Sequence, residues 1–569
     1  YISQEVLQSQ NLVDSWIKKF CEVDFLTDMH KEHLKNLCEA HIPSFVESYQ
    51  TLPNKYDIVA NQCVLSTFSI LESILNPAYG LNMKGTEEYV LEYINIAFTF
   101  ASAWGFAATL QGKDSERIDN LIKKKFPNTV FPADSIINCY LNAESASFEL
   151  YSAHLEEFEF DKDKSFWDIL VPTVDTMKLA HIIDMYVDKG KNIFLTGDSG
   201  TGKSVLINNL LKNYYTSKNI DTLAFTFSAQ TNSKTIQDTI ISSLFLLSQK
   251  SRGAKFGRKN VIYVDDVNMP SLETYGAQPP IELLRQMIDQ GVMYDRLEMF
   301  PVSIVDTSLI VLAAPPEGGR NKLTPRFTRH FNMLNFSEAR NTSIGRIFNS
   351  ILANYLQEFD EAIKTTSHNI VNAAIEFYEK ILVEKLPTPS KFHYTFNLRD
   401  LSRVFMGLVR ANKDEIKDSK QLIRLWGHEM SRIFYDRLIN EEDREWFDKT
   451  LGRVSENYLR IRTEDLNLHK VFYTDLFSIG DAEEVYEEVF DAKKIIKSLE
   501  DSQLDYNDRN RNKLNLVFFK EAVEHILRVI RILRQDRGHA LLMGIGGLGK
   551  NSLAKLAAFT CKLQLIEYE

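Results

Sequence analysis

The sequence has few cysteines, and none of them lies in a pattern that binds metal or forms a disulfide framework. They are odd in number and widely spaced, without the short spacing of a zinc site or a redox pair: Cys21, Cys38, Cys63, Cys139 and Cys561. The histidines form no metal constellation in the sequence either. We therefore expect reduced thiols of an intracellular protein, most of them small core residues.

The chain also lacks an excess of positive charge. It has 66 Lys and Arg against 77 Asp and Glu, for a net charge of −11. A protein that neutralises nucleic-acid phosphates needs a basic face, so this balance argues against general nucleic-acid binding. With 25% charged and 44% hydrophobic residues, the composition is that of an ordinary globular protein. It excludes a disordered or collagen-like chain.

A membrane-spanning helix is not expected. Residues 93–112 carry no charged side chain, but polar residues interrupt them and no Lys/Arg cluster flanks them. A stripe of alanines in this stretch predicts a buried helix with a small-residue packing face. The first residues lack an initiator Met and an apolar signal core, and we expect the chain to be a fragment of a longer protein.

The order of the blocks along the chain predicts several domains, roughly three or four at about 150 residues each. Apolar residues at helical spacing predict helices over residues 1–125, and a polar connection follows over residues 126–165. Residues 166–340 alternate strands with helices, which predicts an α/β fold with a parallel sheet. Residues 341–490 are helical again, and residues 491–569 begin a second α/β block. The expected strands span residues 192–196, 222–227, 261–264, 308–312 and 539–543.

A glycine-rich loop after the first of these strands fits the pattern GxxxxGK[ST] at every position. It consists of Gly197, Asp198, Ser199, Gly200, Thr201, Gly202, Lys203 and Ser204. Glycines let backbone N–H groups turn inward around phosphate oxygens, and the N-terminus of the following helix adds a positive dipole end. In such a loop Lys203 reaches the β- and γ-phosphates, and the Ser204 hydroxyl ligates Mg²⁺.

An acidic pair ends the expected strand over residues 261–264. In a P-loop NTPase an acid at the position of Asp265 holds Mg²⁺. The adjacent Asp266 is placed to orient and deprotonate an attacking water. The sequence therefore predicts a metal site at Ser204 and Asp265, and a catalytic role for Asp266.

These residues resemble the AAA+ family, in which the strand usually ends in Asp-Glu. Longer strings resemble the third AAA+ module of dynein heavy chains: DDVNMP from Asp265, YGAQPPIELLRQ from Tyr275, GGRN from Gly318 and PRFTRHF from Pro325. The string VPTVDT from Val171 matches as well. The resemblance implies that Val171, Pro172 and Thr173 begin the loop over the adenine.

The resemblance covers essentially the whole chain and implies an order of modules. Residues 1–125 would be the helical small subdomain of the second module, and residues 126–165 a linker. Residues 166–340 would be the large α/β subdomain of the third module, and residues 341–490 its helical small subdomain. Residues 491–569 would hold a connector and the start of the large subdomain of the fourth module, with its P-loop.

The resemblance also implies roles for single residues. Arg399 matches the lid arginine that contacts the γ-phosphate, and either Arg326 or Arg329 matches the arginine finger that a module presents to the preceding module's nucleotide. Asp266 is one methylene shorter than the usual Glu, and Ala314 stands where a polar Asn is usual. Both departures predict slow hydrolysis.

A second glycine-rich loop near the end of the chain resembles the P-loop of the fourth module. Its candidate phosphate-binding residues are Gly544, Gly546, Gly547, Gly549 and Lys550. Asn551 replaces the Ser or Thr whose hydroxyl would ligate Mg²⁺, although its amide oxygen remains a weaker ligand. Phosphate binding is expected here, and catalysis is left open.

The sequence thus predicts an ATP-binding segment of a dynein motor with ATP or ADP and Mg²⁺ as cofactors. The third site would bind and slowly hydrolyse ATP to regulate microtubule-based motility of the whole ring. The alternative is a nucleotide-binding regulatory module without turnover, and an AAA+ chaperone or clamp loader ranks third.

The resemblance also implies partners and a location. The partners would be neighbouring AAA+ modules and, through the full-length protein, microtubules and dynein intermediate and light chains, with no nucleic acid and no membrane. The residues of these strings resemble those of axonemal dyneins. We therefore expect the protein to be located in the cytoskeleton of a cilium or flagellum, with the cytoplasm as the alternative.

Overall fold

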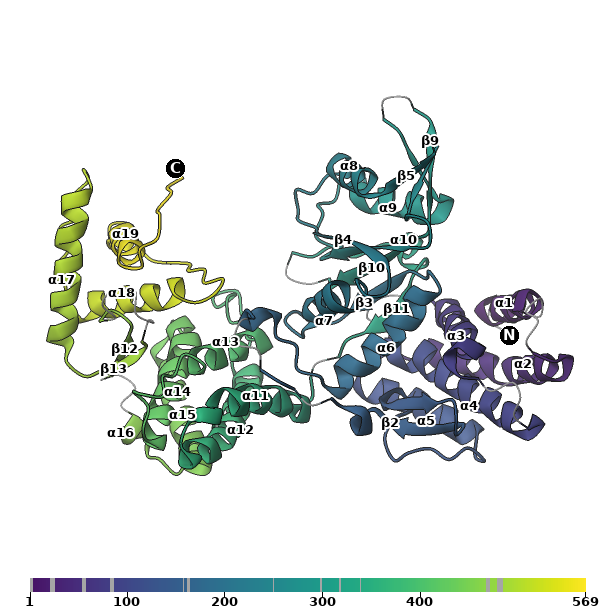
Figure 1. Ribbon diagram of the computed structural model, residues 1–569, viewed down its shortest axis with the longest axis horizontal. Coiled ribbons are helices and arrows are strands. Elements are labelled where there is room, and N and C mark those ends of the chain that lie inside the picture. Colours follow the sequence, from purple (N-terminus) through teal and green to yellow (C-terminus); the bar gives the residue numbers. More distant parts are fainter. Residues whose placement is uncertain are drawn as a thin grey trace. The chain divides into compact units, whose positions relative to one another are not determined.

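The computed structural model divides the chain into two compact units. The first unit comprises residues 1–157 and 172–343, and the second unit comprises residues 158–171 and 344–569. Each unit joins a helical block to the P-loop block that follows it in the chain (Figure 1). The structure describes residues 4–20, 26–53, 58–81, 86–156, 158–160, 164–248, 250–296, 299–316, 319–337, 339–466, 471–477 and 485–568.

Helices form the N-terminal part of the first unit. Its described α-helices are α1 (Gln4–Phe20), α2 (Asp28–Gln50), α3 (Ala60–Ile74), α4 (Glu87–Phe106) and α5 (Gly112–Lys125). Helix α4 begins where the Thr86 side chain accepts a hydrogen bond from the backbone N–H of Tyr89. Its second half is buried from Phe98 to Phe106, which confirms the buried helix predicted for this charge-free stretch. Within the described part of the chain, no helix combines the length and apolarity needed to cross a bilayer.

The polar connection expected over residues 126–165 contains a packed hairpin. Its strands are β1 (Cys139–Asn142) and β2 (Ser147–Leu150), which pair antiparallel. Leu141 and Phe148 are buried on this hairpin. Four cysteines are free and buried: Cys38, Cys63, Cys139 and Cys561. Cys21 lies outside the described residues.

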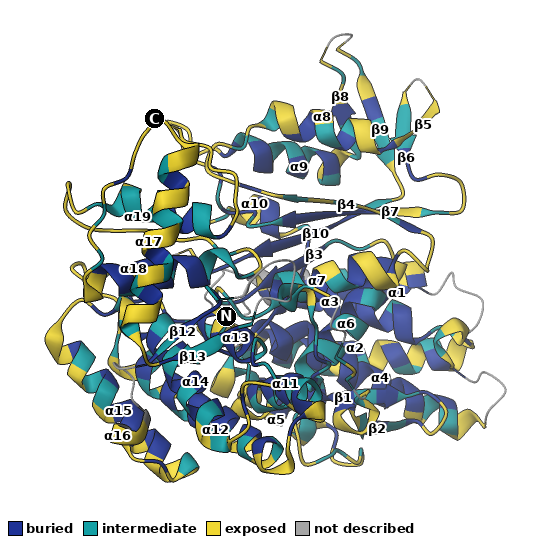
Figure 2. Ribbon diagram, turned by 60° about the vertical axis from the view of Figure 1, so that its left-hand side comes forward, coloured by how far each residue is buried: buried dark blue, intermediate teal, exposed yellow. Residues whose placement is uncertain are grey.

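A five-stranded parallel sheet forms the core of the α/β part, which confirms the predicted fold class. Its strands are β3 (Ile193–Thr196), β4 (Ile220–Thr226), β7 (Lys259–Asp265), β10 (Thr307–Ala313) and β11 (Asn332–Asn335), in the order β11-β3-β10-β7-β4. Strands β3 and β10 are inner strands, and they are buried over almost their whole length (Figure 2). Edge strand β4 alternates between less and more exposed positions instead. The four strands predicted in this block are confirmed, and β11 was not predicted.

After β3 the chain runs to the edge strand β4 and returns through β7 and β10, and β11 is then added on the other side of β3, so the strand order reverses at β3. Ligands of α/β sheets bind at the carboxyl ends of strands where the strand order reverses. The helices of this part are α6 (Val174–Asp188), α7 (Lys203–Asn209), α8 (Ser233–Ser243), α9 (Pro279–Gln290) and α10 (Pro325–Thr328). A second, four-stranded sheet consists of β5 (Phe245–Ser248), β6 (Ser251–Gly253), β9 (Pro301–Val305) and β8 (Val292–Tyr294), in that order.

The second unit is mostly helical. Its helices are α11 (Asn341–Tyr355), α12 (Glu361–Glu384), α13 (Leu398–Leu408), α14 (Ser419–Ile433), α15 (Glu441–Leu459), α16 (Thr463–Leu466), α17 (Ala492–Arg509), α18 (Lys520–Leu533) and α19 (Lys550–Thr560). A short antiparallel pair joins β12 (Phe472–Thr474) to β13 (Glu487–Val489). A cluster of buried apolar residues, among them Ile526, Ile530 and Leu556, packs α18 against α19.

The strand predicted over residues 539–543 is wrong. These residues have no regular secondary structure, and Leu541 and Met543 are exposed. A strand needs a neighbour to pair its backbone groups. None of the described strands of the second unit pairs with this segment.

Candidate nucleotide-binding site

The glycine-rich loop leaves the carboxyl end of β3 and leads directly into α7. Three of its glycines have positive φ: 150° at Gly197, 84° at Gly200 and 101° at Gly202. A Cβ on Gly197 would also collide with the backbone carbonyl oxygen of Phe336. Only glycine fits this backbone without strain, and such a backbone can direct successive N–H groups inward.

Lys203 opens α7 and points its ammonium group back into the loop. The Nζ atom donates hydrogen bonds to the carbonyl oxygens of Gly197 at 2.8 Å and Asp198 at 2.6 Å. Burial lowers the pKa of Lys203 to about 8, against the opposing effect of carboxylates that include Asp265 and Asp266. The lysine ammonium is thus held against the start of the loop, with acidic groups nearby.

Ser204 and Asp265 lie together although they come from different strand–helix junctions. The Ser204 Oγ donates a hydrogen bond to the Asp265 Oδ2 at 2.7 Å. A hydroxyl and a carboxylate oxygen are ligands that Mg²⁺ accepts, with water and phosphate oxygens filling the remaining positions. The residues present therefore fit a Mg²⁺–nucleotide complex. Among the described residues, no three His, Cys, Asp or Glu side chains gather in a separate metal cluster.

Asp266 follows in a left-handed backbone conformation, with φ of 50°. Its backbone N–H donates to the Asp265 Oδ1 at 2.9 Å. The Arg320 Nη2 lies 3.7 Å from the Asp266 Oδ1. Arg320 belongs to the GGRN string, but the sequence assigned it no role. Gly318 of that string lies outside the described residues.

Ala314 follows β10 and is buried. Its side chain offers no hydrogen bond, and its carbonyl oxygen accepts one from the Asn268 Nδ2 at 2.9 Å. A polar side chain is therefore missing at the position that the family resemblance assigns to a sensor of the γ-phosphate.

The loop expected over the adenine leads into α6. Val171 and Thr173 are buried, and Pro172 lies between them. Thr173 caps α6 in a reciprocal arrangement with Thr176, in which each side chain accepts from the other residue's backbone N–H. This cap fixes where the loop ends and the helix begins.

The two candidate arginine fingers differ in their surroundings. Arg326 on α10 is exposed, and among the described residues its guanidinium has no ion-pair or hydrogen-bond partner. The Arg329 Nη2 lies 3.7 Å from Asp289, and its Nε donates to His330 at 3.3 Å. Arg326 is therefore the side chain with fewer internal contacts.

Arg399 belongs to the second unit, whereas the first P-loop belongs to the first unit. It lies exposed in the first turn of α13, where its backbone N–H donates to the Asn397 Oδ1 at 3.0 Å. The capping box formed by Asn397 and Asp400 starts α13 at this point. The structure thus places Arg399 at the N-terminus of α13.

The second glycine-rich loop repeats the geometry of the first. Gly547 and Gly549 have φ of 83° and 72°, at the positions that correspond to Gly200 and Gly202. The Lys550 Nζ donates to the carbonyl oxygens of Gly544 at 2.7 Å and Ile545 at 2.8 Å. Those acceptors lie six and five residues before the lysine, as they do for Lys203. Gly546 and Asn551 are exposed.

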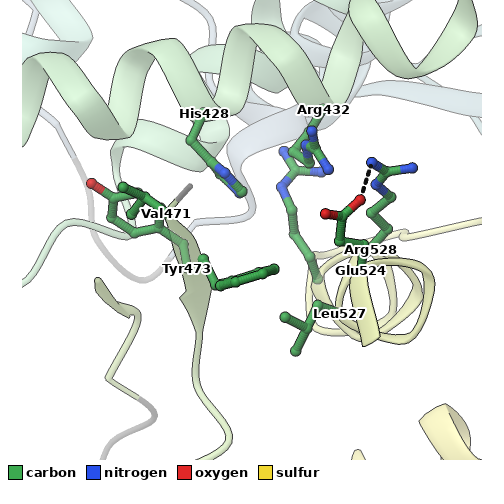
Figure 3. Close-up of a pocket in the computed structure, with 9 residues that line it drawn as sticks. His428, Arg432, Val471, Tyr473, Glu524, Leu527 and Arg528 are labelled. Carbon is green, nitrogen blue, oxygen red and sulfur yellow. Dashed lines mark hydrogen bonds and ion pairs between the residues drawn. The ribbon is translucent and has the colours of Figure 1, made fainter. Parts of the chain in front are cut away.

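A cavity in the second unit is lined by basic side chains whose charges are already compensated. Its lining comprises His428, Arg432, Val471, Phe472, Tyr473, Glu524, Leu527, Arg528 and Arg531 (Figure 3). Asp436 lies 3.4 Å from Arg432 and from Arg528. Arg531 pairs with the buried Glu429. Each of these arginines has a carboxylate partner, so we place no phosphate here.

Four family models match the chain in succession. They are described as a dynein heavy chain AAA lid domain over residues 34–153 and a P-loop containing dynein motor region over residues 158–339. An AAA+ lid domain follows over residues 370–468, and a P-loop containing dynein motor region D4 over residues 514–569. Both glycine-rich loops fall within the P-loop matches.

The chain is also similar to axonemal dynein heavy chains. Dynein axonemal heavy chain 6 of Homo sapiens is 34% identical over 581 residues, which cover 100% of this chain and 14% of that protein. Dynein axonemal heavy chain 1 of Homo sapiens is 34% identical over 614 residues, with the same coverage. Dynein axonemal heavy chain 12 of Mus musculus is 39% identical over 428 residues, which cover 72% of this chain and 14% of that protein. The chain therefore spans a small part of the length of these relatives.

Proposed function

The chain belongs to the dynein heavy chain family as a segment of its AAA+ motor region, and on that premise we propose that its first P-loop binds ATP or ADP with Mg²⁺. The observation that carries the proposal is the contact between the Ser204 hydroxyl and the Asp265 carboxylate beside a complete glycine loop. Lys203 would bind the β- and γ-phosphates, and Val171, Pro172 and Thr173 would border the adenine. Mg²⁺ at Ser204 and Asp265 would offset the charge of the phosphates.

We assign this site to the third module of the ring. The match to motor region D4 begins at residue 514, after the first P-loop and its lid, which supports third place for the first P-loop and fourth place for the second. The helical block before the first P-loop would then be the lid of the second module. The glycines and Lys550 of the second loop would bind phosphate as well.

Members of the AAA+ motor family are ATPases, and we propose slow turnover at the first site. Asp266 would act as the base that orients and deprotonates the attacking water. Arg399 would reach the γ-phosphate from the lid. The short Asp266 side chain and the apolar Ala314 both favour a low rate.

The second candidate is a site that holds nucleotide without turnover and gates the ring. Ala314 is the observation that favours it, because its side chain cannot position water. An AAA+ chaperone or clamp loader is disfavoured by the matches to dynein motor regions.

We extend the proposal to the whole protein through its relatives. Nucleotide at this site would regulate microtubule-based motility driven by the complete ring, with neighbouring modules as direct partners. Intermediate and light chains and microtubules would bind other parts of the full-length protein. The names of the relatives support an axonemal location in a cilium or flagellum, with the cytoplasm as the alternative.

A single-turnover assay with radiolabelled ATP tests turnover. We expect slow phosphate release from the wild-type chain and none from Lys203→Ala. Equal release from both proteins contradicts hydrolysis at this site. Nucleotide binding that Lys203→Ala abolishes, without phosphate release, would favour the second candidate.

A further inference from the structure

We propose that Arg320 is a positioning residue of the first P-loop site, which offsets the charge of Asp266 and so lets the site accept a triphosphate in preference to a diphosphate. This inference rests on the proposed nucleotide binding. It concerns the loop after β10, to which the sequence assigned no function beyond Ala314.

Three hydrogen bonds tie the loop after β10 to the loop after β7. The Asn268 Nδ2 donates to the carbonyl oxygen of Ala314 at 2.9 Å, and the Asn321 backbone N–H donates to the carbonyl oxygen of Asn268 at 3.0 Å. The Asn321 Nδ2 donates to the carbonyl oxygen of Pro270 at 2.7 Å. Since Arg320 and Asp266 are near neighbours of these residues in the chain, the cross-links hold the two charged residues on facing loops.

The contact between Arg320 and Asp266 is a charge pair rather than a close hydrogen bond. The separation of 3.7 Å exceeds hydrogen-bond length, and 24% of the arginine and 37% of the aspartate side chain is exposed. The Arg320 Nε is buried without a hydrogen-bond partner among the described residues. The guanidinium therefore stays near Asp266 because the loop is anchored, not because a bidentate bond locks it.

Arg320 is linked to the P-loop site through the acidic pair. Asp266 directly follows Asp265, and its backbone N–H donates to the Asp265 Oδ1 at 2.9 Å. The Asp265 Oδ2 accepts a hydrogen bond from the Ser204 hydroxyl at 2.7 Å, one residue after Lys203. The Arg320 guanidinium, 3.7 Å from Asp266, therefore lies beside the residues that would hold Mg²⁺ and phosphate.

These positions give a simple balance of charge. Asp266 alone would repel the terminal phosphate of ATP, and Arg320 cancels that repulsion. The diphosphate lacks the terminal group and is affected less. Arg320 thus supplies, from later in the same loop, a polar contribution that the Ala314 side chain lacks.

The test is the affinity of the 569-residue chain for ADP and for the non-hydrolysable β,γ-imido analogue of ATP, measured by calorimetry with Mg²⁺. A Lys550→Ala background restricts the measurement to the first site. We expect Arg320→Gln to weaken binding of the triphosphate about tenfold and that of ADP less than about threefold. Arg320→Lys keeps the charge and should stay within about threefold of the wild type for both ligands.

The decisive variant is Asp266→Asn combined with Arg320→Gln. Removing both charges restores the balance, so triphosphate affinity should return to within about threefold of the wild type. Asp266→Asn alone should raise the preference for triphosphate over ADP. The matched control is Arg117→Gln, which removes an exposed arginine of α5 that lies 3.3 Å from Asp114, and it should change neither affinity.

The outcomes separate this inference from the proposed function. If the wild type and Lys203→Ala bind nucleotide equally, the function itself is wrong. If only the wild type binds, but Arg320→Gln retains its preference for triphosphate or Asp266→Asn does not restore it, the role of Arg320 is wrong. If Arg320→Gln does not fold, as judged by thermal unfolding, Asp266→Asn alone decides: an unchanged preference overturns the inference.

Discussion

The Ser204 hydroxyl donates a hydrogen bond to the Asp265 carboxylate at 2.7 Å, and this contact joins the first turn of α7 to the end of β7. Strand β3, which leads through the glycine loop into α7, and strand β7, which ends at Asp265, are not neighbours, because β10 lies between them. The contact therefore depends on the sheet order and not on local sequence. It brings together two oxygen groups suited to one metal ion.

Ser204→Ala is expected to weaken Mg²⁺-dependent nucleotide binding. Alanine suits the first turn of α7, so the fold should persist, but one metal-ligand oxygen is lost. We expect ATP affinity in Mg²⁺ to fall about tenfold, and affinity in EDTA to stay within about twofold. Calorimetry under both conditions measures this. Ser242→Ala, at an exposed position of α8, is the matched control, and an equal loss with and without Mg²⁺ would contradict the metal site.

Gly197→Ala is expected to destabilise the first unit and abolish nucleotide binding. The added methyl group would collide with the Phe336 carbonyl, and φ of 150° is unfavourable for alanine. We expect a loss of about 3 kcal/mol in the free energy of unfolding, from backbone strain and displacement of β11 together. Gly257→Ala is the control, since Gly257 also has a positive φ, of 76°, but an added Cβ there would meet no atom within 4 Å. It should lose about 1 kcal/mol by strain alone. Urea unfolding measures both losses. If Gly197→Ala and Gly257→Ala lose the same free energy of unfolding, the collision with Phe336 does not contribute.

The strand predictions succeeded where apolar runs are long and buried. Strands β7 and β10 contain continuous apolar runs because helices or other strands cover both faces, and such runs are visible in the sequence. Strand β11 has only four residues, with Asn332 and Asn335 at its ends. Because its two ends are polar, the sequence shows no apolar run here, although all four residues are buried. Residues 539–543 look like a strand but lack a partner among the described residues, and a single sequence does not reveal pairing.

Some features of the site can also be predicted from the sequence, and others depend on tertiary contacts. The glycine pattern and the acidic pair can be found from spacing, because each lies at a strand end. The nearness of Arg320 to Asp266 cannot be found in this way. It depends on Asn321 bonding to Asn268, two residues that are far apart in the chain. Only the folded backbone shows that these loops face one another.

Arg326→Ala is expected to impair the nucleotide site of the preceding module in the full-length heavy chain. Its guanidinium has no partner among the described residues and is available to a neighbour. We expect ATP affinity at that neighbouring site to fall about tenfold, because a cation facing the γ-phosphate is lost. Arg329→Ala should have an effect below about threefold, since Arg329 already pairs with Asp289. The measurement is nucleotide retention by the full-length chain, and a larger effect of Arg329→Ala would reverse the assignment.

Asn551→Ser is expected to strengthen Mg²⁺-dependent binding at the second P-loop. Lys550 already repeats the carbonyl contacts of Lys203, so the hydroxyl is the group that the loop lacks. We expect affinity for ATP in Mg²⁺ to rise about threefold to tenfold, and to be unchanged in EDTA. The measurement uses a Lys203→Ala background, which removes binding at the first site. Asn551→Ala is the control for loss of the amide, and an equal gain with alanine would show that the hydroxyl is not responsible.

His181 on α6 is held between two tyrosines. Its Nδ1 lies 2.7 Å from the Tyr151 hydroxyl, and its Nε2 lies 3.0 Å from the Tyr79 hydroxyl. Burial lowers the pKa of His181 to about 4, from an ordinary value of 6.5. The folded protein therefore keeps this imidazole neutral at a pH where the unfolded chain protonates it.

The sign of the effect follows from proton binding. Between pH 6.5 and about 4 the unfolded state binds more protons at this position, so acid favours unfolding. The stability is fully present above pH 6.5 and is lost as the pH falls toward 4, by about 2 kcal/mol at pH 5. His181→Gln removes the titrating group. Urea unfolding of both proteins at pH 7, 6 and 5 should show the wild type losing its advantage over the variant, because all other titrating groups cancel in the difference. A difference that stays constant from pH 7 to pH 5 would mean that His181 takes up its proton equally in the folded and the unfolded state, so that folding does not lower its pKa.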